Sequence, residues 1–82
     1  MSRRLLLLTR PECGLCEAFL AEFIACFGPG RFEIERVDVD SREDWRQRFG
    51  LKIPVLLDAA DGLPLATTRF DAQALRDQLL NG

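Results

Sequence analysis

The chain turns from an apolar run into an amphipathic one within Thr9-Arg10-Pro11-Glu12-Cys13-Gly14-Leu15-Cys16. This stretch sets two cysteines three positions apart at the junction. If a helix begins at Gly14, Cys13 lies at its N-terminus, where unpaired N–H groups and the positive end of the helix dipole favour a thiolate. A C-x-x-C pair between a strand and a helix indicates dithiol redox chemistry, with Cys13 as the nucleophile and Cys16 as the resolving thiol.

The segments around this stretch predict a strand, a helix and a second strand. A continuous apolar run over residues 4–9 suits a strand that is covered on both faces, and Pro11 forces the chain out of the sheet. Apolar residues at helical spacing predict a helix over residues 14–27, which ends at Gly28-Pro29-Gly30. Strict alternation of apolar and polar residues predicts a half-buried strand over residues 32–40. Two strands around one helix form a βαβ unit, which is normally parallel.

A short helix is expected next, over residues 41–49. Ser41 is a good N-cap for it, and Gly50 stops it. Trp45 and Phe49 are four positions apart, so we expect both side chains to face the sheet.

A hairpin and a closing helix complete the pattern. Two apolar runs, residues 54–58 and 63–68, are joined by a turn with an Asp-Gly signal and predict antiparallel strands. Pro54 opens the first run, where a strand tolerates it. Asp71 is a good N-cap for a helix over residues 72–80.

The composition is that of one small globular domain spanning residues 1–82. Hydrophobic residues make up 48% of the chain and charged residues 29%, which argues against disorder. The net charge is −2, so we expect neither nucleic acid nor a membrane as a partner. We also expect a monomer. The chain has no histidine, which excludes imidazole bases, Cys–His pairs and His-containing zinc sites.

The cysteine count points to a reducing compartment. Three cysteines are an odd number, whereas a small secreted framework carries an even number. The apolar run near the start is four residues long, Leu5 to Leu8, and export signals need about 7 to 15. We therefore expect a cytoplasmic protein. Cys26 falls on the apolar stripe of its helix and is expected to be buried as a small hydrophobe.

The order of elements, with the cysteine pair after the first strand, resembles the glutaredoxin-like branch of the thioredoxin superfamily, and especially a family of small bacterial glutaredoxin-like proteins. The resemblance is carried by Cys13-Gly14-Leu15-Cys16, by Ile53-Pro54 and by Arg10, three residues before the first cysteine. It implies an α/β, thioredoxin-like fold of the order strand-helix-strand-helix-strand-strand-helix. The expected sheet has four mixed strands with helices on both faces, and Pro54 is expected in cis, facing the cysteine pair.

The resemblance also implies a function and its contacts. The expected activity is that of a thiol-disulfide oxidoreductase acting on protein or small-molecule disulfides, with no required cofactor. Arg10 and Asp71 are expected to meet charged ends of a peptide-like substrate. Leu15 offers an apolar contact, and the backbone of Ile53, beside Pro54, is expected to pair with an extended substrate strand.

Three pairs of residues depart from the usual glutaredoxin pattern. Glutaredoxins carry Pro-Tyr or Pro-Phe between the cysteines, Thr-Val before the cis proline and Gly-Gly near the last helix. This chain has Gly14-Leu15, Lys52-Ile53 and Thr68-Arg69 at those places. Bulkier residues in place of two glycines crowd a backbone-lined groove, so glutathione, a possible reductant, is expected to bind weakly.

Two other classes of function stay open at this point. One is a metal or iron–sulfur binding module, in which a second protomer would complete the ligands, because a lone C-x-x-C supplies too few. The other is a non-catalytic thioredoxin-like domain that binds a partner through its surface.

Overall fold

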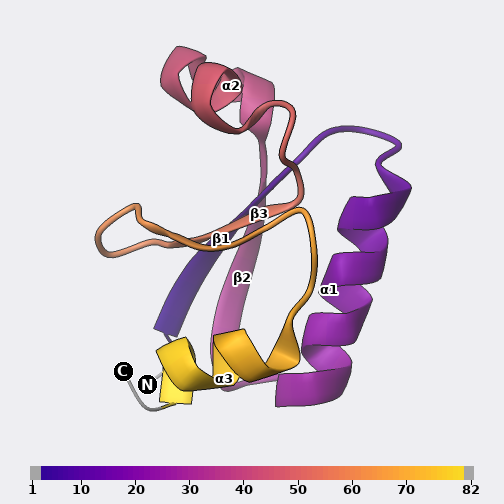
Figure 1. The fold of residues 1–82 in the computed structure, drawn as a ribbon, viewed down its shortest axis with the longest axis vertical. Coiled ribbons are helices and arrows are strands. Elements are labelled where there is room, and N and C mark those ends of the chain that lie inside the picture. Colours follow the sequence, from indigo (N-terminus) through magenta and orange to yellow (C-terminus); the bar gives the residue numbers. More distant parts are fainter. Residues whose placement is uncertain (1–2, 81–82) are drawn as a thin grey trace.

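The computed structural model describes residues 3–80, which form a four-stranded sheet and three α-helices (Figure 1). The strand order is β2-β1-β3-β4, which places β1 (Arg3–Thr9) between β2 (Phe32–Asp38) and β3 (Val55–Asp58), with β4 (Pro64–Thr67) outermost. β1 is parallel to β2 and antiparallel to β3, and β3 is antiparallel to β4. The predicted mixed sheet and its order of elements are confirmed.

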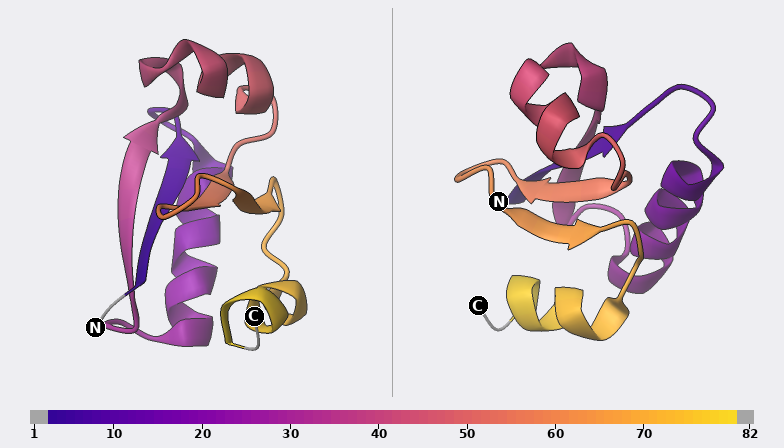
Figure 2. Two further views of the ribbon diagram at one scale, coloured as in Figure 1. Left: turned by 90° about the vertical axis from the view of Figure 1, so that its left-hand side faces the viewer. Right: turned by 45° about the horizontal axis from the view of Figure 1, so that its top comes forward.

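Alternation along the central strands builds two apolar clusters, because successive side chains of a strand point to opposite faces. Leu5 and Leu7 of β1 lie on one face, and Leu6 and Leu8 on the other. The first cluster packs α1 (Gly14–Phe27) and α3 (Ala72–Leu80) against the sheet; its buried members are Leu5, Leu7, Phe19, Phe23, Phe27, Leu56, Leu75 and Leu79. The second cluster takes Phe49 from α2 (Glu43–Phe49); its other buried members are Leu8, Val39, Val55 and Leu57. Helices therefore contribute to both faces, and Figure 2 shows α2 at one end of the sheet and α1 along its side.

The start of α2 differs from the prediction. β2 ends at Asp38 and not at residue 40, because the Asp38 carboxylate accepts the backbone N–H of Asp40 at 2.8 Å and starts a 3-10 turn, η1 (Val39–Ser41). Such a local bond competes with the strand ladder. Ser41 does not cap α2, since its hydroxyl donates to the carbonyl of Asp38 at 2.6 Å. Arg42 holds the N-cap position and makes no side-chain cap bond.

Two other local predictions agree with the structure. Phe49 is buried and Trp45 is half-buried, and both pack in the second cluster. Asp71 caps α3, since its carboxylate accepts the backbone N–H of Ala74 at 3.1 Å. Within residues 3–80 no helix has the length and apolar character needed to cross a membrane.

Candidate dithiol site

The two cysteines of the C-x-x-C motif meet at the N-terminus of α1. Cys13 is the N-cap residue with extended backbone angles, and its Sγ accepts the backbone N–H of Cys16 at 3.2 Å. The pair is joined as a disulfide, with the two Cα atoms 5.3 Å apart. The helix therefore aims a backbone donor at the Cys13 sulfur, as the sequence predicted for a residue at this helix end.

The two sulfur positions differ in exposure. Cys16 is 2% exposed and packs inside the protein, whereas Cys13 is half-buried. Leu15, between them, is 64% exposed. A molecule that approaches this helix end can therefore reach Cys13 and Leu15 but not Cys16.

A residue with a left-handed backbone conformation, Glu12, lies in the turn between β1 and α1. Glu12 has φ +61°, a conformation that is uncommon outside glycine. Glu12 comes directly before the Cys13 N-cap, so the turn that presents the first sulfur is conformationally demanding. Backbone of this kind concentrates at functional sites.

Thr68 ties the end of β4 to the segment around Pro54. Its backbone N–H donates to the carbonyl of Pro54 at 2.7 Å, and its hydroxyl donates to the carbonyl of Lys52 at 2.9 Å. The Ile53–Pro54 peptide bond between these two carbonyls is cis. Thr68 itself has φ +65°, so the chain keeps a glycine-like conformation at a place where it lacks the glycine. The sequence pattern indicated the missing glycine but not this role for Thr68.

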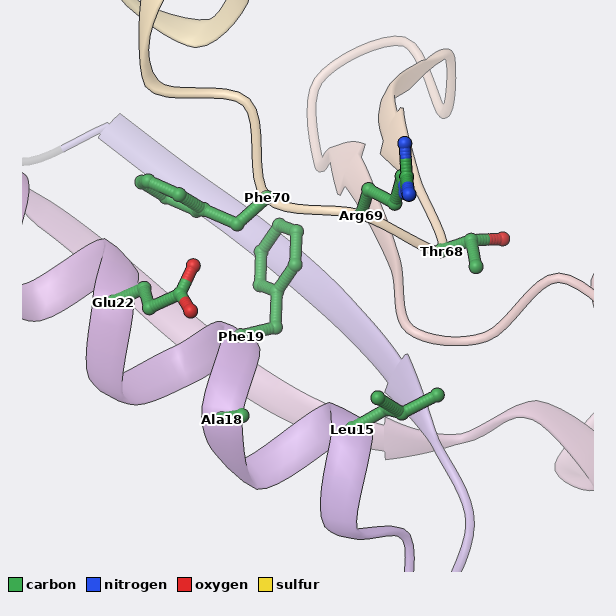
Figure 3. A pocket seen from close by; sticks show the side chains of 7 residues that line it. All are labelled: Leu15, Ala18, Phe19, Glu22, Thr68, Arg69 and Phe70. Atoms are coloured by element: carbon green, nitrogen blue, oxygen red, sulfur yellow. The ribbon is translucent and has the colours of Figure 1, made fainter.

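A cavity of about 330 Å³ opens between α1 and the segment before α3 (Figure 3). Phe19 and Phe70 pack edge to face in it, with ring centroids 5.5 Å apart. The carboxylate of Glu22 points into the space between the two segments, whereas the Arg69 side chain points away from α1. The residues that line the cavity are Leu15, Ala18, Phe19, Glu22, Thr68, Arg69 and Phe70. Of these residues only Leu15 was predicted as a substrate contact. Ala18, Phe19 and Glu22 follow it on α1 at helical spacing, and that spacing could have indicated them.

Arg10 and Asp71 already have partners inside the protein. The Arg10 guanidinium binds both carboxylate oxygens of Asp40, at 2.9 and 3.0 Å, and the carbonyl of Gly50 at 2.6 Å. The bond to Asp40 raises the pKa of Arg10, and the same bond lowers the pKa of Asp40. Asp71 caps α3 and is not part of the cavity wall.

Cys26 is less enclosed than predicted. It is half-buried at the border of the first cluster, and Nη2 of Arg76 lies 3.3 Å from its sulfur. Cys26 packs against the first cluster but is half-buried, so its predicted burial holds only in part.

The metal-module alternative meets few candidate ligands in this chain. Among residues 3–80, no three side chains of His, Cys, Asp or Glu are grouped so that they could hold a metal ion. Cys13 and Cys16 are bonded to each other as a disulfide.

A C-x-x-C pair at the start of the first helix, in a four-stranded mixed sheet with a proline-led third strand, defines a thioredoxin-like protein. Within that class, the chain belongs to the family described as "Glutaredoxin-like domain (DUF836)", whose model matches residues 4–80. The predicted family is thereby confirmed.

Two solved structures are similar over nearly the whole chain. Protein Ne2328 from Nitrosomonas europaea, determined by NMR in solution, has a TM-score of 0.84 and 24% identity, with 96% of this chain and 93% of that chain covered. The X-ray structure of protein XcR50 from X. campestris has a TM-score of 0.70 and 31% identity, with 95% and 97% covered. No curated protein is a significant match.

Proposed function

We propose that this protein is a thiol-disulfide oxidoreductase that uses Cys13 and Cys16 on disulfides of proteins or small molecules. The observation that carries the proposal is the asymmetry of the pair: a half-buried cysteine at the helix N-cap, whose sulfur accepts the N–H of Cys16, and a buried cysteine joined to it as a disulfide. The family assignment supports redox chemistry at this pair.

The proposed reaction has two thiol–disulfide exchanges. The Cys13 thiolate attacks one sulfur of the substrate disulfide, whose S–S bond breaks, and the released thiolate takes a proton from water. Cys16 then loses its proton and attacks the Cys13 sulfur, which frees the second substrate thiol and leaves the Cys13–Cys16 disulfide. The substrate gains two electrons and the protein dithiol loses two, so an external thiol reductant must restore the dithiol.

The helix terminus is the main proposed source of thiolate stabilisation. The Cys16 N–H and the positive end of α1 both favour a negative sulfur at Cys13. Two of the nearby charges that could add to or oppose this effect are compensated within the protein, whereas the exposed carboxylate of Glu12, directly before Cys13, opposes it. Arg10 is paired with Asp40, and Glu17 is paired with Arg36 at 2.6 Å.

The cavity beside Leu15 is the proposed seat for the substrate residues next to the disulfide. Its apolar floor of Phe19 and Phe70 suits side chains of a protein substrate. Thr68 and Arg69 stand where a glutathione groove would need glycines, so we propose that glutathione binds weakly. We also propose that the protein needs no cofactor and that it acts as a monomer in a reducing, cytoplasmic setting.

Replacement of each cysteine in turn tests this function. The reduced protein should reduce a small disulfide; Cys13→Ser should fall to the uncatalysed rate, and Cys16→Ser should trap a mixed disulfide on Cys13. Cys26→Ser is the matched control and should keep the parent rate, because Cys26 lies apart from the pair. Equal activity of Cys13→Ser and the parent would overturn the proposal. A visible absorption band from bound iron would favour the metal module in its place.

A further inference from the structure

Arg10 connects three segments that are far apart in the sequence. It follows the last residue of β1 and lies three positions before Cys13. Its guanidinium holds Asp40 in η1 through two parallel hydrogen bonds and Gly50, at the C-terminus of α2, through a third. Such a planar, bidentate arrangement is specific to arginine, since a lysine ammonium cannot reproduce it.

Each partner of Arg10 is itself fixed in place. The N–H of Asp40 is held by the Asp38 carboxylate at 2.8 Å. Gly50 is buried, and a Cβ atom added to it would lie 2.5 Å from the carbonyl oxygen of Arg46 and 3.0 Å from Nη2 of Arg10. Gly50 has φ −55°, so it is required for this close approach and not for an unusual backbone conformation.

Both ends of this connection lead directly to the site. On one side the chain continues from Arg10 through Glu12 to Cys13. On the other side it continues from Gly50 to the cis Ile53–Pro54 bond, whose flanking carbonyls Thr68 holds. The Arg10 charge is balanced by Asp40, which leaves little of it for a substrate anion or for the Cys13 thiolate.

We propose that Arg10 is a positioning residue, which holds the Cys13 turn against the segment that leads to Pro54 by bridging Asp40 and Gly50. This inference rests on the proposed oxidoreductase function and assigns Arg10 a role other than substrate contact. Without the bridge, the turn that carries Cys13 and the segment that leads to Pro54 can move relative to one another. Displacements of about 1 Å in a reaction site can cost about 100-fold in rate.

Four variants separate positioning from a direct effect of charge. Arg10→Lys keeps the charge but loses the bidentate geometry, and Asp40→Asn frees the guanidinium charge while it breaks the bridge. Positioning predicts that both variants lose about 10- to 100-fold in kcat/KM. Gly50→Ala, which blocks the approach, should lose activity in the same direction. Arg42→Gln is the matched control: it removes another bidentate pair, with Asp44 at 3.0 and 2.8 Å, and should keep the parent kcat/KM.

The readouts include quantities that a merely structural role would not move. For reduced protein we expect the pKa of the Cys13 thiol, followed by thiolate ultraviolet absorbance, to change in the same direction in Arg10→Lys and Asp40→Asn. We expect kcat to fall equally with an anionic disulfide, that of mercaptoacetate, and a neutral one, that of mercaptoethanol. Circular dichroism and cooperative thermal unfolding confirm that each variant is folded at the assay temperature.

Two results would overturn the inference alone. One is an Arg10→Lys variant with parent kcat/KM, and the other is an Asp40→Asn variant with a raised rate or with a KM lowered only for the anionic disulfide. The first would mean that the bidentate geometry of Arg10 is not needed, and the second that Arg10 acts through its charge. A parent protein that reduces neither disulfide would overturn the proposed function, and this inference with it.

Discussion

The hydroxyl of Thr68 donates a hydrogen bond to the carbonyl oxygen of Lys52 at 2.9 Å, across 16 positions of sequence. With the backbone bond from Thr68 to Pro54, it holds the end of β4 against the segment that leads into β3. This residue, in a left-handed conformation at a strand end, also lines the cavity beside Leu15.

Thr68→Val should destabilise the protein by about 0.5–1.5 kcal/mol, because it removes this hydrogen bond and keeps the shape of the side chain. The free energy of unfolding in urea measures the effect. Thr67→Val is the control, since Thr67 is an exposed neighbour in β4. Equal stability of the two variants would mean that the Thr68 hydroxyl contributes nothing.

The double variant Thr68→Gly/Arg69→Gly should improve the use of glutathione. Glycine adopts φ +65° without steric cost, and removal of both side chains widens the cavity between α1 and the segment before α3. We expect a lower KM for glutathione during recovery of the reduced protein, with little change for dithiothreitol. If both reductants respond alike, crowding by these side chains does not explain the weak glutathione binding that we propose.

Leu15→Ser should raise the KM for a protein disulfide and leave stability within about 0.5 kcal/mol, because the side chain is 64% exposed. Leu63→Ser is a matched control, since Leu63 is 60% exposed and lies before β4, outside the cavity. Kinetics with a reducible protein substrate compare the two. An equal KM in both variants would exclude Leu15 from substrate contact.

Asp58 should make the protein acid-sensitive. A hydrogen bond from Arg3, and then one from the backbone N–H of Ala60, hold the pKa of Asp58 below its ordinary value of 3.8. The folded state therefore binds this proton less readily than the unfolded chain does. The resulting stabilisation is fully present at pH values above the ordinary pKa of an aspartate. It is lost as the pH falls through the lower pKa that Asp58 has in the folded state.

The acid sensitivity is measured by urea unfolding at a series of pH values. Asp58→Asn should flatten the loss of stability at low pH. Glu43→Gln, at an exposed carboxylate whose pKa Arg46 lowers, should flatten it less, because exposed pairs are screened by solvent. A larger effect at Glu43 would contradict the prediction.

Phe23→Ala should cost about 3–5 kcal/mol, because this side chain is fully buried in the first cluster. Its ring lies 4.7 Å from that of Phe27 and 5.7 Å from that of Phe32, centroid to centroid. Ile24→Ala, next to it on α1 and 46% exposed, should cost less. Unfolding midpoints in urea test the order of the two costs.

Local patterns were sufficient for most of the fold. The apolar run from Leu5 to Leu8 predicted the central strand, since it is too short for a buried helix and suits a strand covered on both faces, and β1 does lie between β2 and β3. The prediction that Ser41 is the N-cap of α2 was wrong. The Asp38 carboxylate accepts the backbone N–H of Asp40 and forms η1, and the Ser41 hydroxyl donates to the carbonyl of Asp38 instead. Two residues that can both form local bonds compete, and propensity alone does not say which of them wins.

The sequence by itself determined the order of elements, the two apolar faces of the sheet and the place of Cys13 at a helix end, because periodicity and spacing are local properties. Only the tertiary structure decided that Cys16 is enclosed while Cys13 is accessible, that Thr68 holds the Pro54 segment and that Arg10 is bound to Asp40 and Gly50. These relationships join residues 14 to 40 positions apart, and such contacts depend on how the helices pack on the sheet. No periodicity in the chain encodes them.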